Sequence, residues 1–230
     1  MSVPAATGSV GAAGSAHRDR LVQAMITLVA ERGYAAVTVA DVVAAARVSK
    51  RTFYQHFSDR EDCFLAAYVT AAEQPLTRIA EAVAPVVEAA PGAATPSLAD
   101  EVTAGTSAYL AALAEQPALT RTLLTEINGL GARGWRVRRE VLNRFAEQLS
   151  ALIALGAARW ASGESGPAAV PELAGVRGLP HPTALALVGG INELVLDAVE
   201  DGRGDRLGEL TPTVTELILA VIDRTARPEG

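Results

Sequence analysis

Residues 38–57, with the sequence TVADVVAAARVSKRTFYQHF, restrict the fold of this chain more than any other stretch. Thr38 followed by Asp41 is a capping-box pattern, and it opens a segment in which apolar residues recur at helical spacing. Ser49 is suited to cap a second helix that begins at Lys50. The stretch therefore predicts two short helices joined by a tight turn.

The second predicted helix separates apolar from polar side chains. At about 100° per residue, Phe53 and Phe57 point together toward a small core. The opposite face and its two rims carry Arg51, Thr52, Tyr54, Gln55 and His56. Such a helix suits the major groove of DNA, where central side chains contact base edges and peripheral ones contact phosphates.

Positive charge is concentrated on the same stretch. Between Arg47 and Phe57 there are three basic residues and no acidic one, in a chain whose formal net charge is -6. Lys50 is the only lysine of the sequence. An acidic protein can still bind DNA, because phosphate contacts depend on the local field at the docking face. The alternative is a helical hairpin whose charges face only water.

This stretch resembles the N-terminal region of the TetR family of bacterial transcriptional regulators. The family pattern G-Y…T-V…D-V…A…V-S-K…T-F-Y-x-H-F…E-D is matched by Gly33, Tyr34, Thr38, Val39, Asp41, Val42, Ala46, Val48, Ser49, Lys50, Thr52, Phe53, Tyr54, His56, Phe57, Glu61 and Asp62. The resemblance covers about residues 17 to 65, and the remainder is similar only in length and helical pattern. Arg47 and Arg51 stand where the family commonly has glycine, and Arg60 replaces a usual lysine.

The resemblance implies an all-α protein of about nine helices, with a three-helix helix-turn-helix unit followed by a helical ligand-binding and dimerisation domain. The corresponding division is a flexible tail over 1–16, a DNA-binding domain over 17–62 and a second domain over 63–230. Arg51, Thr52 and Gln55 are expected at base edges. The residues expected at phosphates are Thr38, Lys50, Tyr54, His56 and Arg60.

The other helices are predicted from apolar periodicity, caps and breakers. They cover about 17–32, 60–90, 97–115, 117–128, 135–160, 183–200 and 211 onward. Ser58 with Glu61 is a second capping-box pattern, and Ser97 with Asp100 is a third. We expect a kink or break near Pro75 and Pro85 in the 60–90 helix. Residues 161–182, rich in proline and glycine, are predicted to be a mobile linker.

The second domain is where the resemblance implies a small-molecule site between helices. Rings near polar groups make five residues candidates, although packing in the core would explain the same rings. These candidates are Tyr109, Glu126, Asn128, Trp135 and Phe145. The scarcity of charge around them suggests an apolar or aromatic effector.

The last two helices are apolar enough to require burial on more than one side, and the resemblance implies that they pair with their copies in a homodimer. The candidate interface residues are Leu187, Ile191, Leu194, Leu217, Ile218 and Val221. Burial within the monomer is the alternative. A two-fold partner would let a short recognition helix gain specificity from two half-sites.

Signals for enzymes, metals and membranes are weak. The three histidines lie far apart, one cysteine cannot supply a thiolate cluster, and the segment 129–134, which spells GxGxxG, lacks a βαβ context and is expected to be a helix connection. Cys63 fits a reducing cytoplasm, residues 1–16 lack the features of a signal peptide, and no uninterrupted apolar run is long enough to span a membrane.

The sequence thus predicts a cytoplasmic regulator without cofactor. It is expected to act as a homodimeric repressor on a palindromic double-stranded operator, released by a small ligand. The alternatives are a ligand-independent DNA-binding protein and a helical enzyme.

Overall fold

The part of the chain that the structure describes folds almost entirely into helices. The computed structural model describes residues 9–87, 97–162, 173 and 176–226. Over these residues it contains the α-helices α1 to α9, two short 3-10 turns and no strand. The predicted all-α class is confirmed, and so is the order of a small N-terminal unit before a larger helical body.

The N-terminal unit, called the head below, consists of α1 (Ser9–Arg32), the 3-10 turn η1 (Tyr34–Ala36), α2 (Val39–Ala46) and α3 (Lys50–His56). The predicted caps are present. The Thr38 hydroxyl accepts a hydrogen bond from the Asp41 backbone N–H, and the Asp41 carboxylate accepts one from the Thr38 backbone N–H. The Ser49 hydroxyl accepts one from the backbone N–H of Thr52.

The turn between α2 and α3 has left-handed geometry at Arg47, whose φ is 54°. This conformation costs an L-residue about 1 kcal/mol relative to glycine. The position is the one where the resemblance leads to an expectation of glycine, so the arginine keeps the turn at an energetic cost. Its side chain is exposed.

The start of the chain differs from the expectation. Helix α1 already begins at Ser9, so residues 9–16 are helical and do not form the flexible tail that the sequence predicted. Residues 1–8 of that predicted tail lie outside the described residues.

Helix α4 (Arg60–Val87) connects the head to the body. Its cap is shifted by one residue from the prediction: Asp59 accepts a hydrogen bond from the Asp62 backbone N–H at 2.7 Å, and the Asp62 carboxylate accepts one from the Ser58 backbone N–H at 3.0 Å. The helix is continuous through both Pro75 and Pro85, so the predicted break does not occur. Each proline removes only one backbone bond, and packing along α5 supports the neighbouring turns.

The body contains α5 (Leu98–Ala114), α6 (Pro117–Gly129), α7 (Gly131–Ser162), α8 (His181–Glu200), the 3-10 turn η3 (Leu207–Leu210) and α9 (Thr211–Ala226). The cap of Ser97 with Asp100 and the start of α6 at Pro117 are confirmed. The expected loop over 129–134 is reduced to Leu130, because α7 already begins at Gly131. A Cβ at Gly134 would lie 2.2 Å from the Ile127 carbonyl oxygen, so glycine permits this close passage of α6 and α7.

The head and the body share a hydrophobic core. The head core of α1 to α3 also includes Phe64 and Tyr68 of α4, Ile127 of α6 and Val141 of α7. The predicted domain boundary between residues 62 and 63 therefore falls inside α4, whose first turns pack into the head. A second core joins α7, α8 and α9, and it includes Leu173, Val176 and Leu179. The described parts of the predicted 161–182 linker are thus anchored, and the others lie outside the described residues.

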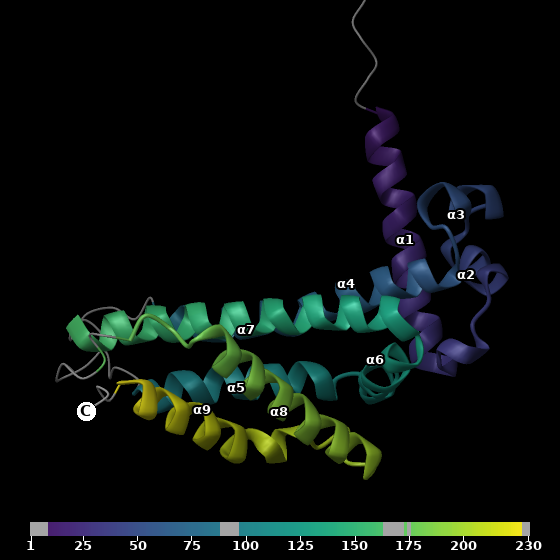
Figure 1. Cartoon of the computed structure of the whole chain (residues 1–230). Coiled ribbons are helices and arrows are strands. Elements are labelled where there is room, and N and C mark those ends of the chain that lie inside the picture. Colours follow the sequence, from purple (N-terminus) through teal and green to yellow (C-terminus); the bar gives the residue numbers. More distant parts are fainter. Residues whose placement is uncertain (1–8, 88–96, 163–172, 174–175, 227–230) are drawn as a thin grey trace, which may run out of the picture.

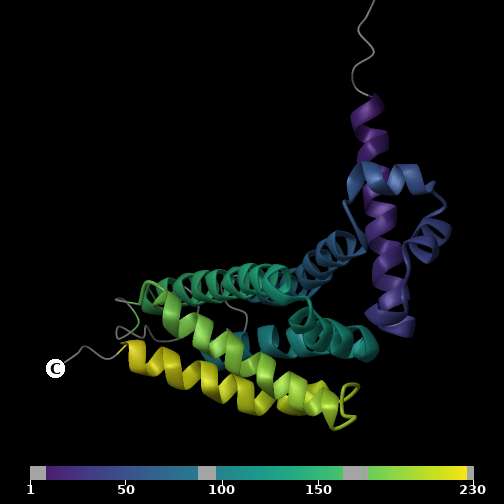
Figure 2. The same ribbon diagram turned by 45° about the vertical axis from the view of Figure 1, so that its right-hand side comes forward.

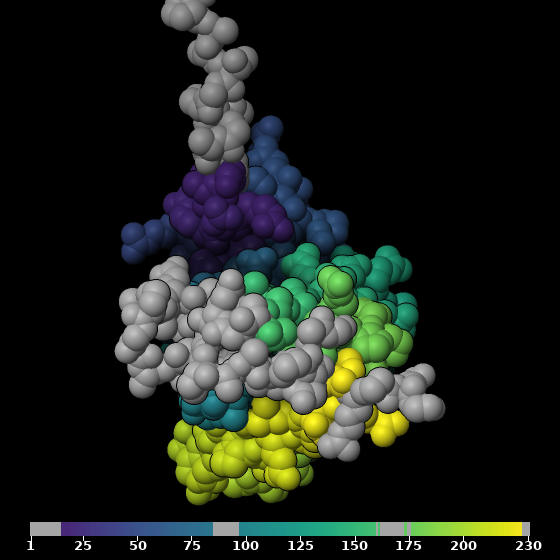
Figure 3. Space-filling view, turned by 90° about the vertical axis from the view of Figure 1, so that its left-hand side faces the viewer, coloured from purple at the N-terminus to yellow at the C-terminus, as the bar shows by residue number. Residues whose placement is uncertain are grey.

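In Figure 1 the head stands at one end of an elongated body, with α1 roughly upright and α4 and α7 running away from it. The view in Figure 2 shows α2 and α3 packed around α1 and α4 leaving the head alongside α7. Helices α8 and α9 form the layer of the body opposite α4 and α7. Seen from the end away from the head, the yellow atoms of the α9 segment form the edge farthest from the purple α1 (Figure 3).

Candidate DNA-binding surface and ligand cavity

Helix α3 presents the face that the sequence predicted. Phe53 and Phe57 are buried, and their ring centroids lie 5.7 Å apart. The side chains of Lys50, Arg51 and Gln55 are exposed, and that of Tyr54 is 58 % exposed. Thr52 and His56 lie half-buried at the rims. Two buried rings therefore fix the helix while its opposite face stays open.

The cations of α3 are available to an anionic partner. Within the part of the chain that the structure describes, neither Lys50 nor Arg51 forms an ion pair or a side-chain hydrogen bond. Helix α1 adds two groups beside the end of α3 that the sequence analysis did not single out. The His17 ring lies 6.5 Å from the His56 ring, and the Arg18 guanidinium lies 5.5 Å from the Phe57 ring centroid. Their type was visible in the sequence, but their proximity to α3 was not.

Two residues predicted to contact phosphates, Thr38 and Arg60, make contacts within the head. The Thr38 hydroxyl is engaged with Asp41 in the capping box. Arg60 stacks over the Tyr34 ring at 4.2 Å, and its Nη1 donates to the Val37 carbonyl oxygen at 2.6 Å. Burial raises the pKa of the Tyr34 hydroxyl, and the Arg60 guanidinium acts in the opposite direction. Arg60 thus holds the η1 turn, which leads directly into α2.

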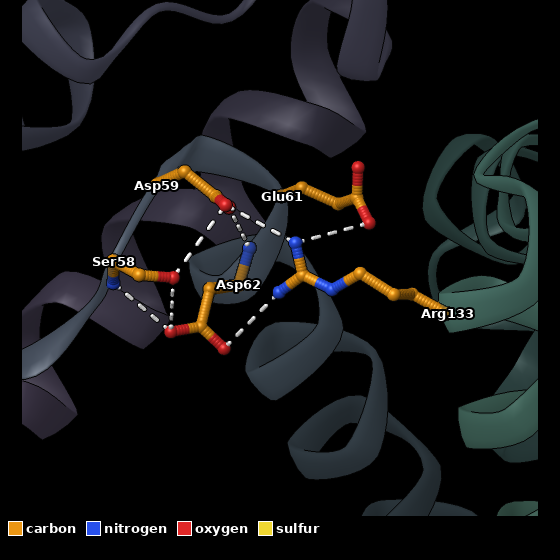
Figure 4. Close-up of polar contacts among 5 residues, drawn as sticks. All are labelled: Ser58, Asp59, Glu61, Asp62 and Arg133. Carbon is orange, nitrogen blue, oxygen red and sulfur yellow. Dashed lines mark hydrogen bonds and ion pairs between the residues drawn. The ribbon is translucent and has the colours of Figure 1, made fainter.

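A cluster of one arginine and three carboxylates connects the body to the start of α4 (Figure 4). This Arg133 cluster consists of Arg133 on the first turn of α7 with Asp59, Glu61 and Asp62. Arg133 Nη1 lies 3.1 Å from Asp59 Oδ2 and 3.3 Å from Glu61 Oε1, and Nη2 lies 3.6 Å from Asp62 Oδ1. The Asp62 backbone N–H is the largest influence that lowers the pKa of Asp59, and Arg133 adds to it. Since the cluster begins two residues after Phe57, it links α7 to the segment that carries α3.

The body contains a cavity of about 120 Å³ between α4, α5, α7, α8 and α9. Its wall is almost entirely apolar and includes Leu76 and Ile79 of α4 and Ile191 of α8. Helix α5 contributes a stripe of six residues at helical spacing: Leu98, Glu101, Val102, Gly105, Thr106 and Tyr109. An apolar enclosure of this size suits a small hydrophobic molecule.

Two of the five predicted ligand-site residues line this cavity. Tyr109 and Phe145 meet edge to face at 5.8 Å, and the Tyr109 hydroxyl lies 3.3 Å from Asn192 Oδ1. The other three are elsewhere. Glu126 lies beside Gly33 at the head, Asn128 is exposed and donates to its own helix, and Trp135 is 53 % exposed near Arg138. These three residues do not line this cavity, and the sequence does not show which face of α6 and α7 meets α5.

The cavity also has polar residues that the sequence analysis missed. Glu101 is only 6 % exposed, and its Oε1 lies 2.6 Å from Arg159 Nη2. Thr106 is 5 % exposed, and its hydroxyl has no hydrogen-bond partner among the described residues. The alternation of Glu101 with small and apolar neighbours on α5 was the available signal.

The six predicted interface residues divide into three groups by their exposure in the monomer. Leu187, Ile191 and Ile218 are buried within the monomer, and the last two line the cavity, so the alternative of monomer burial holds for them. Leu194 and Val221 are half-buried against the same core. Leu217 is 42 % exposed.

Metal binding, thiol chemistry and membrane insertion have little support in the described residues. No group of three or more His, Cys, Asp or Glu side chains there is placed to hold a metal ion. Burial raises the pKa of the Cys63 thiol to about 12, so this sulfur stays protonated and is a poor nucleophile. Helix α8 alone in that part of the chain has the length and apolar composition of a membrane span, a criterion that core helices of soluble proteins also satisfy.

The head and the body together define a class of protein: a helix-turn-helix unit joined to a helical domain with an apolar cavity. The family model described as bacterial regulatory proteins of the TetR family matches residues 21–67, from the middle of α1 to the first turns of α4. This N-terminal segment is therefore similar to that of TetR-family regulators. A search of curated proteins found no match.

Solved structures share the fold over nearly the whole chain. FadR from Bacillus subtilis, solved in complex with stearoyl-CoA, has a TM-score of 0.62 and 19% identity, covering 88% of this chain and 97% of its own. A regulator from Mesorhizobium loti assigned to the TetR family has a TM-score of 0.63 and 19% identity, covering 90% and 97%. The multidrug binding protein EbrR, complexed with imidazole, has a TM-score of 0.58 and 20% identity, covering 93% and 96%.

Proposed function

We propose that this regulator binds a palindromic operator as a homodimer, represses transcription there, and is released by a small, predominantly apolar ligand in the body cavity. The observation that carries the proposal is that α4 directly follows the exposed recognition helix α3 and also lines the cavity with Leu76, Ile79 and Val83. One continuous helix thus connects the two candidate sites.

DNA recognition is assigned to the open face of α3. Arg51, Thr52 and Gln55 would contact base edges, because they occupy the centre of the exposed face opposite Phe53. Lys50, Tyr54 and His56 would contact phosphates from the rims. Arg18 lies beside this face and extends the positive surface, and the His17 ring lies near it, whereas Thr38 and Arg60 support the fold of the head.

The proposed dimer interface uses the outward faces of α8 and α9. On α9, Thr213, Leu217 and Ala220 are exposed at helical spacing. On α8, a Cβ at Gly189 or Gly190 would meet nothing within 4 Å in the monomer. Small residues on one helix and an exposed leucine on the other allow close packing against a copy of the same pair in a two-fold arrangement.

Ligand release is proposed to act through the relative positions of the heads. A ligand between α4, α5 and α7 would change how α4 leaves the body, and the Arg133 cluster would pass this change to the start of α4. A coupling of about 1–3 kcal/mol between ligand and DNA would lower operator affinity 5- to 150-fold. FadR and EbrR bind ligands in the same fold, which supports a ligand role for the body.

The experiment is a footprint of the purified protein on the DNA upstream of its own gene, with and without metabolite extracts. Protection of a symmetric site that is lost with extract supports the proposal. Uniform protection without sequence preference would favour the alternative of a ligand-independent architectural DNA-binding protein.

A further inference from the structure

The most unusual feature of the body cavity is the polar chemistry on an otherwise apolar wall. Glu101 projects from α5 into the wall beside Gly156 of α7, where a Cβ would lie 3.4 Å from Glu101 Oε2. Arg159, one turn further along α7, pairs with the other carboxylate oxygen at 2.6 Å. The two opposite charges are buried together, so the Glu101–Arg159 pair carries no net charge of its own.

Thr106 supplies the second observation. Thr106 lines the cavity one turn from Val102, and its buried hydroxyl has no hydrogen-bond partner among the described residues. A buried hydroxyl without a partner is destabilising unless a bound molecule completes its hydrogen bond. The neighbouring polar groups are already used: Gln148 donates to the Leu76 carbonyl oxygen, and Tyr109 contacts Asn192.

We propose that the cavity selects an electrically neutral ligand with an apolar body and one hydrogen-bonding group, which Thr106 binds while the Glu101–Arg159 pair excludes charged molecules. A ligand carboxylate would meet the Glu101 carboxylate, and a ligand ammonium would compete with Arg159 for it. Either charge would also lose its water in an enclosure without a free counter-charge. A neutral alcohol or amide pays neither cost. This inference rests on the proposed function only in taking the cavity as the effector site.

The first test compares octanol, octanoate and octylamine, which share a chain and differ in charge near neutral pH. Binding to the full-length protein is measured by calorimetry and by thermal shift. Octanol is expected to bind at least about tenfold more tightly than either charged compound. Equal or tighter binding of octanoate or octylamine would overturn the charge selection, and the absence of octanol binding would overturn the ligand class.

The second test changes the charge pair. Arg159→Gln leaves the Glu101 carboxylate without this partner, so the ratio of octylamine to octanol affinity should rise about tenfold or more. The double variant with Glu101→Gln removes both charges and should restore the preference for octanol. Because it leaves no unpaired buried carboxylate, it also serves as the test if the single variant folds poorly. Arg78→Gln is the matched control, because it breaks the exposed Arg78–Glu115 pair of 3.2 Å. An unchanged ranking in folded Arg159→Gln protein would refute the role of the pair.

The third test removes the unpartnered hydroxyl. Thr106→Val keeps the shape of the side chain and should weaken octanol binding about three- to tenfold. Thr215→Val is the control, since Thr215 is also buried with an unpartnered hydroxyl but lies outside the cavity wall. Equal losses in both variants would contradict the assignment. If octanol binds as expected but does not release the operator, the proposed function fails and the cavity assignment stands.

Discussion

At the scale of single residues, the head has well-formed helix caps and one strained backbone conformation, at Arg47. Thr38 and Ser49 cap α2 and α3, and Phe53 fixes the helix that carries Arg51. Arg47 holds a left-handed turn that glycine would adopt without strain. An exposed arginine at this place, next to the recognition helix, adds positive charge where an anionic partner would bind.

The roles of Arg51 and Tyr54 can be separated by substitution. Arg51→Ala should relax the preference for one base position per half-site at a cost of about 1–3 kcal/mol, because a base contact is lost. Tyr54→Phe should weaken all sequences alike, because only a phosphate contact is lost. An operator is first selected from random duplexes. The affinities of each protein for single-base variants of that operator then measure both effects. Unchanged base preference in Arg51→Ala would show that this residue does not read bases.

At the scale of helices, α4 and α7 determine how the head is attached to the body. They share the core around Phe64 and Val141, and the Arg133 cluster lies between their first turns. Each ion pair in the cluster is partly exposed to solvent, so its contribution to global stability is small. Its effect is expected to be local, on the first turn of α4.

Arg133→Gln should therefore increase amide exchange at the first turn of α4 while leaving the free energy of unfolding almost unchanged. Hydrogen-deuterium exchange and urea unfolding measure the two quantities. Arg144→Gln is the control, since Arg144 joins the same two helices through a 3.9 Å pair with Glu73 farther from the head. Equal exchange in both variants would argue against a special role of the cluster.

Acid should weaken the same region through Asp59. Its pKa is lowered in the folded protein, so its stabilising contribution is complete above its unfolded pKa of about 4 and is lost as the pH falls through the folded value. Asp59→Asn retains a good cap but removes the charge. The wild type should exceed the variant in stability by less than about 1 kcal/mol at about pH 6, and the difference should shrink toward about pH 3. Urea midpoints at both pH values test this, and a constant difference would contradict it.

At the scale of the whole molecule, the proposed assembly assigns the head to DNA and the α8–α9 layer to a partner copy. The two regions carry different chemistry: unpaired cations on α3, and small or apolar residues on the outer faces of α8 and α9. In a two-fold dimer built on that layer, both heads would extend from the same assembly and contact two half-sites.

Leu217→Glu should give a monomer that binds the operator on the order of a hundredfold more weakly, because the second half-site no longer adds to affinity. Sedimentation and gel-shift titration measure the two effects. Leu155→Glu on α7 is the matched control, since Leu155 is 50 % exposed but lies on another helix. A Leu217→Glu protein that remains dimeric would exclude this interface. Ile218→Glu is not a fair test, because it would place a charge on the cavity wall.

The sequence by itself determined the helix-turn-helix unit, because its caps, its spacing of apolar residues and its exposed cations are local properties read within a few turns. It also indicated Tyr109 and Phe145, two residues that line the cavity, as candidates for the small-molecule site, because this chain has few aromatic residues. Only the tertiary structure decided which helix faces meet. That pairing places Glu101 against Arg159, directs Ile218 inward and Leu217 outward, and brings Arg133 to the start of α4. These contacts join residues tens of positions apart, and the pattern along a single helix does not specify its neighbour.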